Sequence, residues 1–260
     1  MTYRVQVIPK LKRRILPGRT TVKTPYGLQV IEDCLTCPLV KEHIFCNLPR
    51  PVLTALDAIS SSATYPKDAI LFVEGQEPRG VFVLCNGRAK LSTSSAEGKS
   101  IIVRVAEPGE MVGLPGTISG KPYEVTAEAL EPLQANFIRR EAFLRFLKEN
   151  GEVAVRVAEI LIHIYQATLL EVRYLGLSAS TAEKLARFLL DQPVRSTQDG
   201  GQTKITMTLT HKEIAEMLGA SRETVTRLFA NFKREQLVEV HGSTIVIANR
   251  AGLQRLVNVV

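Results

Sequence analysis

The most constraining feature of this 260-residue chain is the run Thr208–Phe232, which predicts two short helices joined by one tight turn. Thr210, followed three residues later by Glu213, has the pattern of a capping box, in which each side chain bonds the other residue's backbone. Gly219 supplies the residue that ends the first helix, and Ser221 caps the second. Two helices connected this closely form a helix-turn-helix.

The second of these helices has one apolar and one polar face. Its apolar residues recur at the spacing of a buried helical face: Val225, Leu228, Phe229 and Phe232. The opposite face carries Glu223, Thr226, Arg227 and Ala230, and Arg222 in the first turn can reach the same side. Arginine can fork onto guanine O6 and N7, and a carboxylate can accept from cytosine N4. We therefore expect Arg222, Glu223 and Arg227 to read DNA bases, supported by Thr210, Ser221, Thr224, Thr226, Lys233 and Arg234.

The segment after these helices predicts a β-hairpin. Leu237–Val240 and Thr244–Ile247 flank a His241-Gly242 turn, which gives the helix-turn-helix a wing. An ordinary helical hairpin with surface salt bridges is the alternative, but caps, turn, polar stripe and wing all agree on a DNA-binding unit. Before it, Thr181–Leu190 is an expected helix and Pro193–Gln202 an expected polar loop.

Between Tyr65 and Phe137, short runs of β-forming residues alternate with turn residues. Many short strands at close spacing predict an antiparallel barrel or roll. The expected strands are Ala69–Glu74, Gly80–Cys85, Arg88–Thr93, Ser100–Ala106, Tyr123–Leu130 and Leu133–Phe137.

The chain then becomes helical. Glu141–Lys148 is a short amphipathic segment, and a long helix follows from Glu152 to about Leu175. The apolar residues of the long helix cover more than one narrow stripe, so this helix needs two partners. We expect one to be its own β-roll and the other the same helix of a second subunit, with Ile160 and Ile164 in that contact.

The fold class is therefore α+β: an N-terminal antiparallel β-roll, a long dimerisation helix and a C-terminal winged helix-turn-helix. The expected division is a basic extension at residues 1–33, a roll at 34–150, a dimerisation helix at 151–176 and a DNA-binding domain at 177–260.

Charge is distributed unevenly along the chain, whose net charge is +7. Residues 1–31 carry seven Lys or Arg and no acid, and residues 178–260 carry 11 basic against 8 acidic residues. Basic ends suit nucleic-acid binding. The most apolar stretch, Val153–Val172, is interrupted by charged residues and does not predict a membrane span. With no secretory signal and no catalytic motif, we expect a cytoplasmic protein that is not an enzyme.

The helix-turn-helix residues resemble those of the Crp–Fnr superfamily of bacterial regulators. The resemblance is close at Ala220-Ser-Arg-Glu-Thr-Val-Thr-Arg227 and in the wing, and it extends more weakly back to about Cys34. It implies a β-roll sensor resembling cyclic-nucleotide-binding domains and a homodimer on a two-fold DNA site. It also implies base contacts by Arg222, Glu223 and Arg227, with RNA polymerase as an expected further partner.

Family members that bind cyclic nucleotides hold the phosphate with an Arg followed by Ser or Thr, downstream of a Gly-Glu pair. Here Gly109-Glu110 is present, but the later region reads Gly120-Lys-Pro-Tyr-Glu124. A buried phosphate needs a fixed charged partner. We therefore expect no cyclic nucleotide, with the chain's own side chains filling the pocket.

The cysteines leave three alternatives open. Cys34, Cys37 and Cys46 resemble the N-terminal cluster of the oxygen-sensing Fnr branch, which binds a four-iron cluster through four thiolates. The fourth cysteine of that branch corresponds to Leu133–Asn136 here, which leaves Cys85 as the one candidate, although a packed strand cysteine explains it as well. Zinc held by three cysteines and His43 is a second alternative, and metal-free thiols are the third. A metal or redox sensor that has lost DNA binding is the competing functional class.

Overall fold

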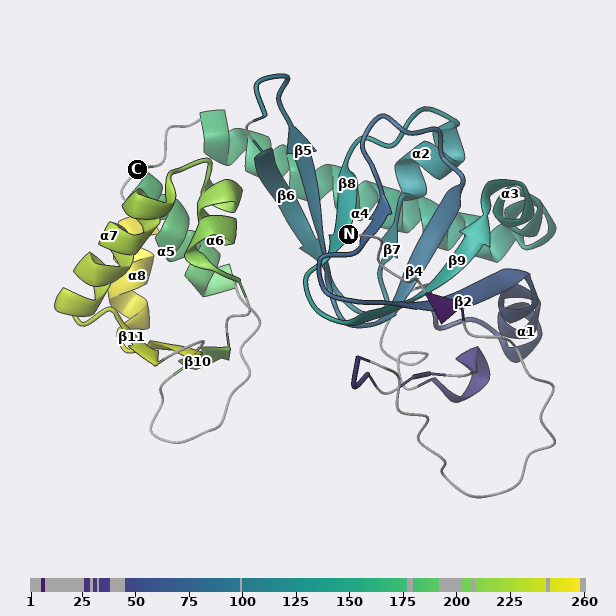
Figure 1. Cartoon of the computed structure of the whole chain (residues 1–260), viewed down its shortest axis with the longest axis horizontal. Coiled ribbons are helices and arrows are strands. Elements are labelled where there is room, and N and C mark those ends of the chain that lie inside the picture. The colour runs from purple at the N-terminus through teal and green to yellow at the C-terminus, as the bar shows by residue number, and fades with distance from the viewer. Residues whose placement is uncertain are drawn as a thin grey trace. The chain divides into compact units, whose positions relative to one another are not determined.

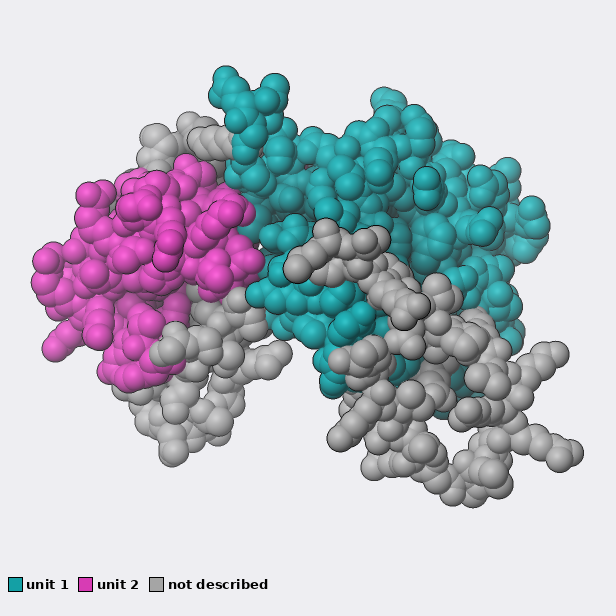
Figure 2. Space-filling model, in the orientation of Figure 1, with its two compact units in different colours: residues 1–167 teal, residues 168–260 magenta. Residues whose placement is uncertain are grey.

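The structure is a computed structural model that describes residues 6–7, 26–28, 30–31, 33–37, 45–98, 100–176, 180–191, 203–206, 209–241 and 244–257 (Figure 1). The chain divides into two compact units, residues 1–167 and 168–260 (Figure 2). Their boundary lies within the long helix α4 (Gly151–Gly176). Most of the predicted basic extension and all of the predicted loop Pro193–Gln202 lie outside the described residues.

The first unit contains two antiparallel sheets that form the predicted roll (Figure 1). Their strand orders are β1-β2-β9-β4-β7 and β3-β8-β5-β6. The strands are β1 (Gln6–Val7), β2 (Ser60–Tyr65), β3 (Ile70–Phe72), β4 (Gly80–Asn86), β5 (Ala89–Ser94), β6 (Ser100–Ala106), β7 (Met111–Val112), β8 (Thr126–Ala129) and β9 (Leu133–Arg139).

The central pair, β4 and β9, packs side chains on both of its faces. Phe82 and Leu84 belong to the core inside the roll, whereas Val81 and Val83 belong to a second core that includes helical residues. Alternate strand residues point to opposite faces, so one strand serves both cores. At Gly80 an added Cβ would lie 2.0 Å from the Ile138 carbonyl oxygen, so a residue without a side chain is required there.

The α-helices among the described residues of this unit are α1 (Arg50–Ile59), α2 (Leu114–Ser119), α3 (Arg140–Glu149) and the first part of α4. A short 3-10 helix, η1 (Cys34–Thr36), precedes them. The second core contains the buried residues of α1, α3 and the first turns of α4: Leu53, Leu56, Phe143, Phe146, Val153 and Val157. The predicted roll partner of the long helix is thereby confirmed.

The second unit contains the predicted winged helix-turn-helix and two elements that were not predicted. Its elements are α5 (Thr181–Asp191), β10 (Thr203–Thr206), α6 (His211–Leu218), α7 (Arg222–Arg234), β11 (Val238–His241), β12 (Thr244–Ile247) and α8 (Arg250–Val257). The wing is a three-stranded antiparallel sheet, because β10 pairs with β12 beside the predicted hairpin. In the described part of the chain, no helix is both long enough and apolar enough to cross a membrane.

Candidate DNA-binding and sensor sites

The start of helix α6 is fixed by a reciprocal capping box. Thr210 Oγ1 accepts from the Glu213 N–H at 3.2 Å, and Glu213 Oε2 accepts from the Thr210 N–H at 2.7 Å. Gly219 ends the helix in the left-handed region at φ 63°, where glycine is favoured. Ser221 Oγ then accepts from the Thr224 N–H at 3.1 Å and caps α7. The predicted caps and turn are all confirmed.

Helix α7 is held by its apolar face. Val225, Phe229 and Phe232 are buried with residues of α5, α6 and the wing. Because this face is packed in the core, the opposite face of α7 points to solvent. Its residues are all exposed: Arg222, Glu223, Thr226, Arg227 and Ala230.

The charged side chains on this exposed face are available for contacts with DNA. No described residue forms an ion pair or hydrogen bond with the guanidinium of Arg222 or Arg227. The pKa of Glu223 is lowered by a hydrogen bond from its own backbone N–H, with help from the Ser221 hydroxyl and from Arg222. Its carboxylate therefore stays charged at neutral pH. Lys233 and Arg234 are exposed in the last turn, at the other end of the helix.

His211 supports this face in a way that the sequence did not reveal. Its ring stacks on Phe229 with centroids 4.9 Å apart and an angle of 9° between the planes. Its Nδ1 lies 3.0 Å from Thr226 Oγ1. The only signal in the sequence was a histidine directly after the helix cap. Its partner Thr226 lies 15 residues later, and this contact depends on how α6 packs against α7.

In the sensor unit, Glu110 of the Gly109-Glu110 pair is engaged within the protein. Its carboxylate accepts from Arg104 at 2.7 Å and from the Glu107 N–H at 3.0 Å. Downstream, Tyr123 is buried, stacks on Phe72 with centroids 4.1 Å apart, and donates its hydroxyl to the Gly80 carbonyl at 2.5 Å. Within the segment where an Arg-Ser pair would stand, an aromatic side chain is thus packed inside the roll.

The four cysteines come from η1, the residues before α1, and strand β4. Cys34 Sγ accepts from the Asn136 side chain at 3.4 Å and also bonds the Asp57 carboxylate of α1. Cys34 and Cys46 pack against the core that contains Val81 and Val83. Cys85 is buried where the β4–β9 register shifts between Leu84 and Asn86.

The thiols influence one another electrostatically. Burial raises the pKa of Cys34 to about 12, with further contributions from Asp57 and then from Cys46 and Cys37. Burial likewise raises the pKa of Cys46 to about 11, with a smaller contribution from Cys37. Burial also raises the pKa of Cys85, and charge on Cys34, Cys46 and Cys37 raises it further. The four thiols therefore lie within electrostatic range of one another. Among the described residues, no group of three or more His, Cys, Asp or Glu is arranged to hold a single metal ion, and His43 lies outside those residues.

Comparison with known proteins agrees with both units. Residues 183–256 match the model of the Crp-like helix-turn-helix domain, and residues 63–150 match that of the cyclic nucleotide-binding domain. The chain belongs to the Crp–Fnr superfamily of transcription regulators.

Individual relatives are distant but extend over much of this regulator. It is 23% identical to the CRP-like cAMP-activated global transcriptional regulator of Mycobacterium tuberculosis, over 84% of this chain and 97% of the relative. It is 28% identical to the transcriptional activatory protein AadR of Rhodopseudomonas palustris, over 67% and 72% of the two chains. The solved structure of FixK2 from Bradyrhizobium japonicum has the same fold, with a TM-score of 0.66, 22% identity and coverage of 76% and 97%.

The structure brings the predicted DNA-facing residues of this regulator together on one surface. Arg222, Glu223, Thr226 and Arg227 share the exposed face of α7, and Lys233 and Arg234 follow at its end. The hydroxyls of Thr210 and Ser221 take part in helix capping, and Ser221 Oγ lies 3.0 Å from Thr224 Oγ1. The supporting role of these three residues toward DNA stays a prediction. Sequence reasoning missed His211 and Tyr123.

Proposed function

We propose that this regulator binds a two-fold-symmetric operator as a homodimer, with Arg222, Glu223 and Arg227 reading bases in the major groove. The observation that supports this most is the orientation of α7. Its apolar face is buried in the unit's core, while both arginines are exposed and unpaired among the described residues. An arginine without an internal partner does not have to break an ion pair before its guanidinium hydrogen-bonds guanine O6 and N7.

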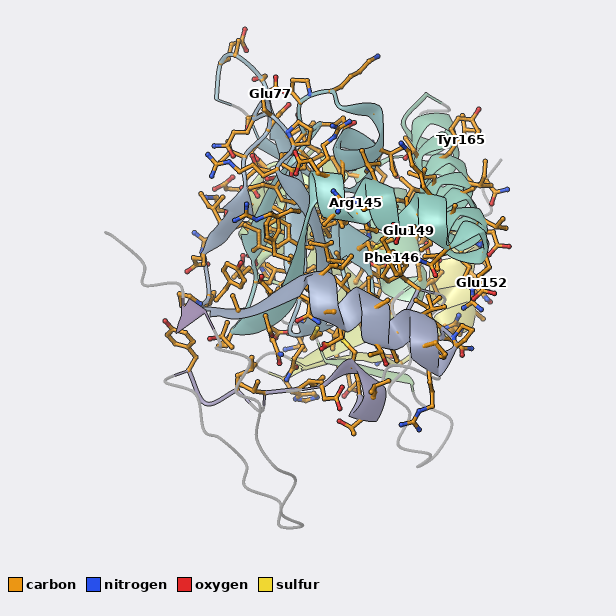
Figure 3. The ribbon with its side chains drawn as sticks, turned by 90° about the vertical axis from the view of Figure 1, so that its right-hand side faces the viewer. Glu77, Arg145, Phe146, Glu149, Glu152 and Tyr165 are labelled. Carbon is orange, nitrogen blue, oxygen red and sulfur yellow. The ribbon has the colours of Figure 1, made fainter. Side chains whose placement is uncertain are left out.

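The homodimer is supported by a second face of α4. Val155, Ile162, Tyr165 and Leu169 have exposed fractions of 60%, 55%, 59% and 43%. Figure 3 shows Tyr165 projecting outward from the helix. These residues fall on one side of α4, opposite the face that packs on the roll, as expected for a helix that pairs with its own copy. Ile160 packs partly against the roll core, so its predicted place in the dimer contact stays a prediction.

The test begins with selection of binding sites from random duplex DNA by the full-length protein. A two-fold site with half-sites about 34 Å apart, one helical turn, is the expected result. Affinity for that site should fall steeply with salt, because each neutralised phosphate contributes close to one unit of slope. Recovery of no common sequence, or of a site without two-fold symmetry, would contradict the proposal.

The proposed setting and partner follow from this role. A protein that reads operators acts where the chromosome is, so we place the regulator in the cytoplasm and assign it no enzymatic activity. We also propose RNA polymerase as its functional partner at promoters. Co-purification of polymerase on operator DNA, with and without the regulator, measures this directly.

We propose that the sensor unit does not respond to cyclic nucleotides. The Gly120–Glu124 segment contains no Arg-Ser pair, and its Tyr123 is buried inside the roll, stacked on Phe72. Glu110 is already paired with Arg104. Titration with cyclic AMP should therefore give no saturable heat and no change in operator affinity.

A second proposal concerns the four thiols as ligands of a four-iron cluster. Three observations support it: Cys34 and Cys46 pack on one core, Asn136 joins Cys34 to strand β9, and Cys85 interacts electrostatically with the other three thiols. A four-iron cluster is larger than a single ion, so the four sulfur ligands surround the cluster and need not converge on one point. Buried thiolates that repel one another are also stabilised by a cationic centre. Such a cluster would supply redox chemistry.

Anaerobic purification tests this second proposal. Brown protein with about four iron and four sulfide per chain supports the cluster, and Cys85→Ser should reduce both contents at least twofold. Stoichiometric zinc in colourless protein would favour the zinc alternative. Protein without any metal would favour the alternative of reduced, metal-free thiols.

A further inference from the structure

A recess at one end of the roll has the composition of a small-molecule site. It has a volume of about 340 Å³, within the lower part of the range for ligand pockets. Five aromatic side chains line it: Tyr65, Phe72, Phe82, Tyr123 and Phe137. We call it the aromatic recess. It shares only Tyr123 with the segment discussed for cyclic nucleotides.

The aromatic walls pack against one another. Phe72 stacks on Tyr123 and lies 5.8 Å from Phe82, which in turn lies 4.8 Å from Phe137. Phe72, Phe82 and Tyr123 are all buried. A continuous aromatic surface of this kind favours a flat ring as its ligand, by stacking or edge-to-face contact.

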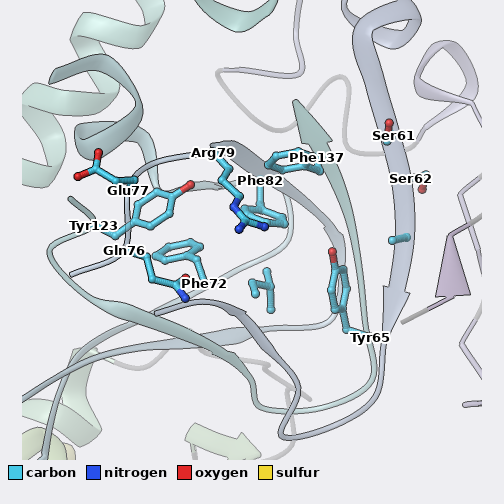
Figure 4. Close-up of a pocket in the computed structure, with 12 residues that line it drawn as sticks. Ser61, Ser62, Tyr65, Phe72, Gln76, Glu77, Arg79, Phe82, Tyr123 and Phe137 are labelled. Atoms are coloured by element: carbon cyan, nitrogen blue, oxygen red, sulfur yellow. The ribbon is translucent and has the colours of Figure 1, made fainter. Parts of the chain in front are cut away.

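Two hydrogen-bond donors face the recess without a partner in the described structure. The Tyr65 side chain is only 7% exposed, yet its hydroxyl forms no hydrogen bond with any described residue. The side chain of Arg79 likewise forms no ion pair or hydrogen bond there. Figure 4 shows the Tyr65 hydroxyl and the Arg79 guanidinium pointing into the recess from different sides, while the Glu77 carboxylate points away.

These donors specify the charge of the ligand. Burial raises the pKa of Tyr65, so its phenol keeps its proton and donates. Arginine forks onto planar carboxylates. The apolar walls would penalise a dianion such as phosphate more than a monoanion balanced by one arginine. We infer that the aromatic recess binds a small aromatic carboxylate, with Arg79 and Tyr65 holding the carboxylate and the phenylalanines contacting the ring.

Isothermal titration calorimetry of the full chain without DNA tests this, so that its failure is separate from failure of operator binding. Benzoate is the probe, and neutral benzamide is the matched compound of the same shape. We expect saturable binding of benzoate, and at least tenfold weaker binding of benzamide. Arg79→Gln should weaken benzoate binding at least tenfold and Tyr65→Phe about threefold.

Arg145→Gln is the control, because Arg145 is exposed on α3 and does not line the recess. It should leave the affinity unchanged. No saturable heat with millimolar benzoate, or equal affinity in Arg79→Gln and the parent protein, would overturn the inference.

Discussion

The side chain of Gln134 pairs with the backbone of Ile31 as a neighbouring strand would. Its Oε1 accepts from the Ile31 N–H at 2.8 Å, and its Nε2 donates to the Ile31 carbonyl at 2.7 Å. Nε2 also donates to Ser62 Oγ at 3.0 Å. Gln134 is fully buried, so one side chain of β9 anchors the segment that leads to Cys34 and Cys37.

Gln134→Leu should therefore release that segment. Loss of these bonds costs about 1–2 kcal/mol, which shifts a local opening equilibrium by roughly 5–30-fold. We expect Cys34 and Cys37 in reduced, metal-free protein to be alkylated faster by that factor, measured by mass spectrometry. Gln254→Leu, on the exposed side of α8, is the control. Unchanged alkylation in Gln134→Leu would show that the segment is held elsewhere.

The exposed stripe of α4 predicts the effect of charge on assembly. Ile162→Asp together with Tyr165→Asp should raise the dimer dissociation constant at least about a hundredfold, because an unpaired charge buried in an interface costs ~3 kcal/mol or more. Analytical ultracentrifugation measures this. His163→Asp changes an exposed polar residue of the same helix and should stay dimeric. If the double variant also remains dimeric, the interface lies on another surface.

Tyr123 and Tyr65 predict contrasting effects of removing a hydroxyl. The Tyr123 hydroxyl bonds both the carbonyl and the N–H of Gly80, at 2.5 and 3.2 Å, whereas that of Tyr65 bonds no described residue. Tyr123→Phe should lower the free energy of unfolding by about 1–3 kcal/mol. Tyr65→Phe should change it by less than about 0.5 kcal/mol. Urea unfolding compares the two, and similar losses would mean that Tyr65 has a bonded hydroxyl after all.

The sequence predicts best where a local rule decides the structure. The capping box at Thr210, the left-handed Gly219 and the cap at Ser221 act within one turn of chain, and all three are present. The six predicted strands of the roll were also found, because turn residues separate them. Helix α1 and strand β2 were missed: α1 starts after Pro49 without a side-chain cap, and β2 (SSSATY) lacks a strong apolar alternation.

Other features depend on contacts between distant residues and cannot be predicted from spacing. Strand β10 exists because it pairs with β12, about 40 residues later. Ile160 and Ile162 are both apolar helical residues, yet the first faces the roll and the second is 55% exposed. The apolar pattern of α4 predicts two partners, but which of its residues face the roll depends on how the roll packs. The mutual proximity of Cys85 and the N-terminal cysteines likewise follows from the β4–β9 pairing.

We propose that Arg227 reads a base while Lys233 contacts phosphate, since both are exposed on α7 but lie almost two turns apart. The direct measurement is the affinity of Arg227→Ala, Glu223→Ala and Lys233→Ala for the selected operator and for all of its single-base variants. We predict that Arg227→Ala loses about 1–3 kcal/mol on the operator and loses discrimination at one base pair of each half-site. Glu223→Ala should bind non-specific DNA more tightly while discriminating less, because it removes a charge that phosphates repel. Lys233→Ala should weaken all sequences equally and reduce the salt slope by about one. Equal weakening of every operator variant by Arg227→Ala would contradict the account, because Arg227 would then be a phosphate contact.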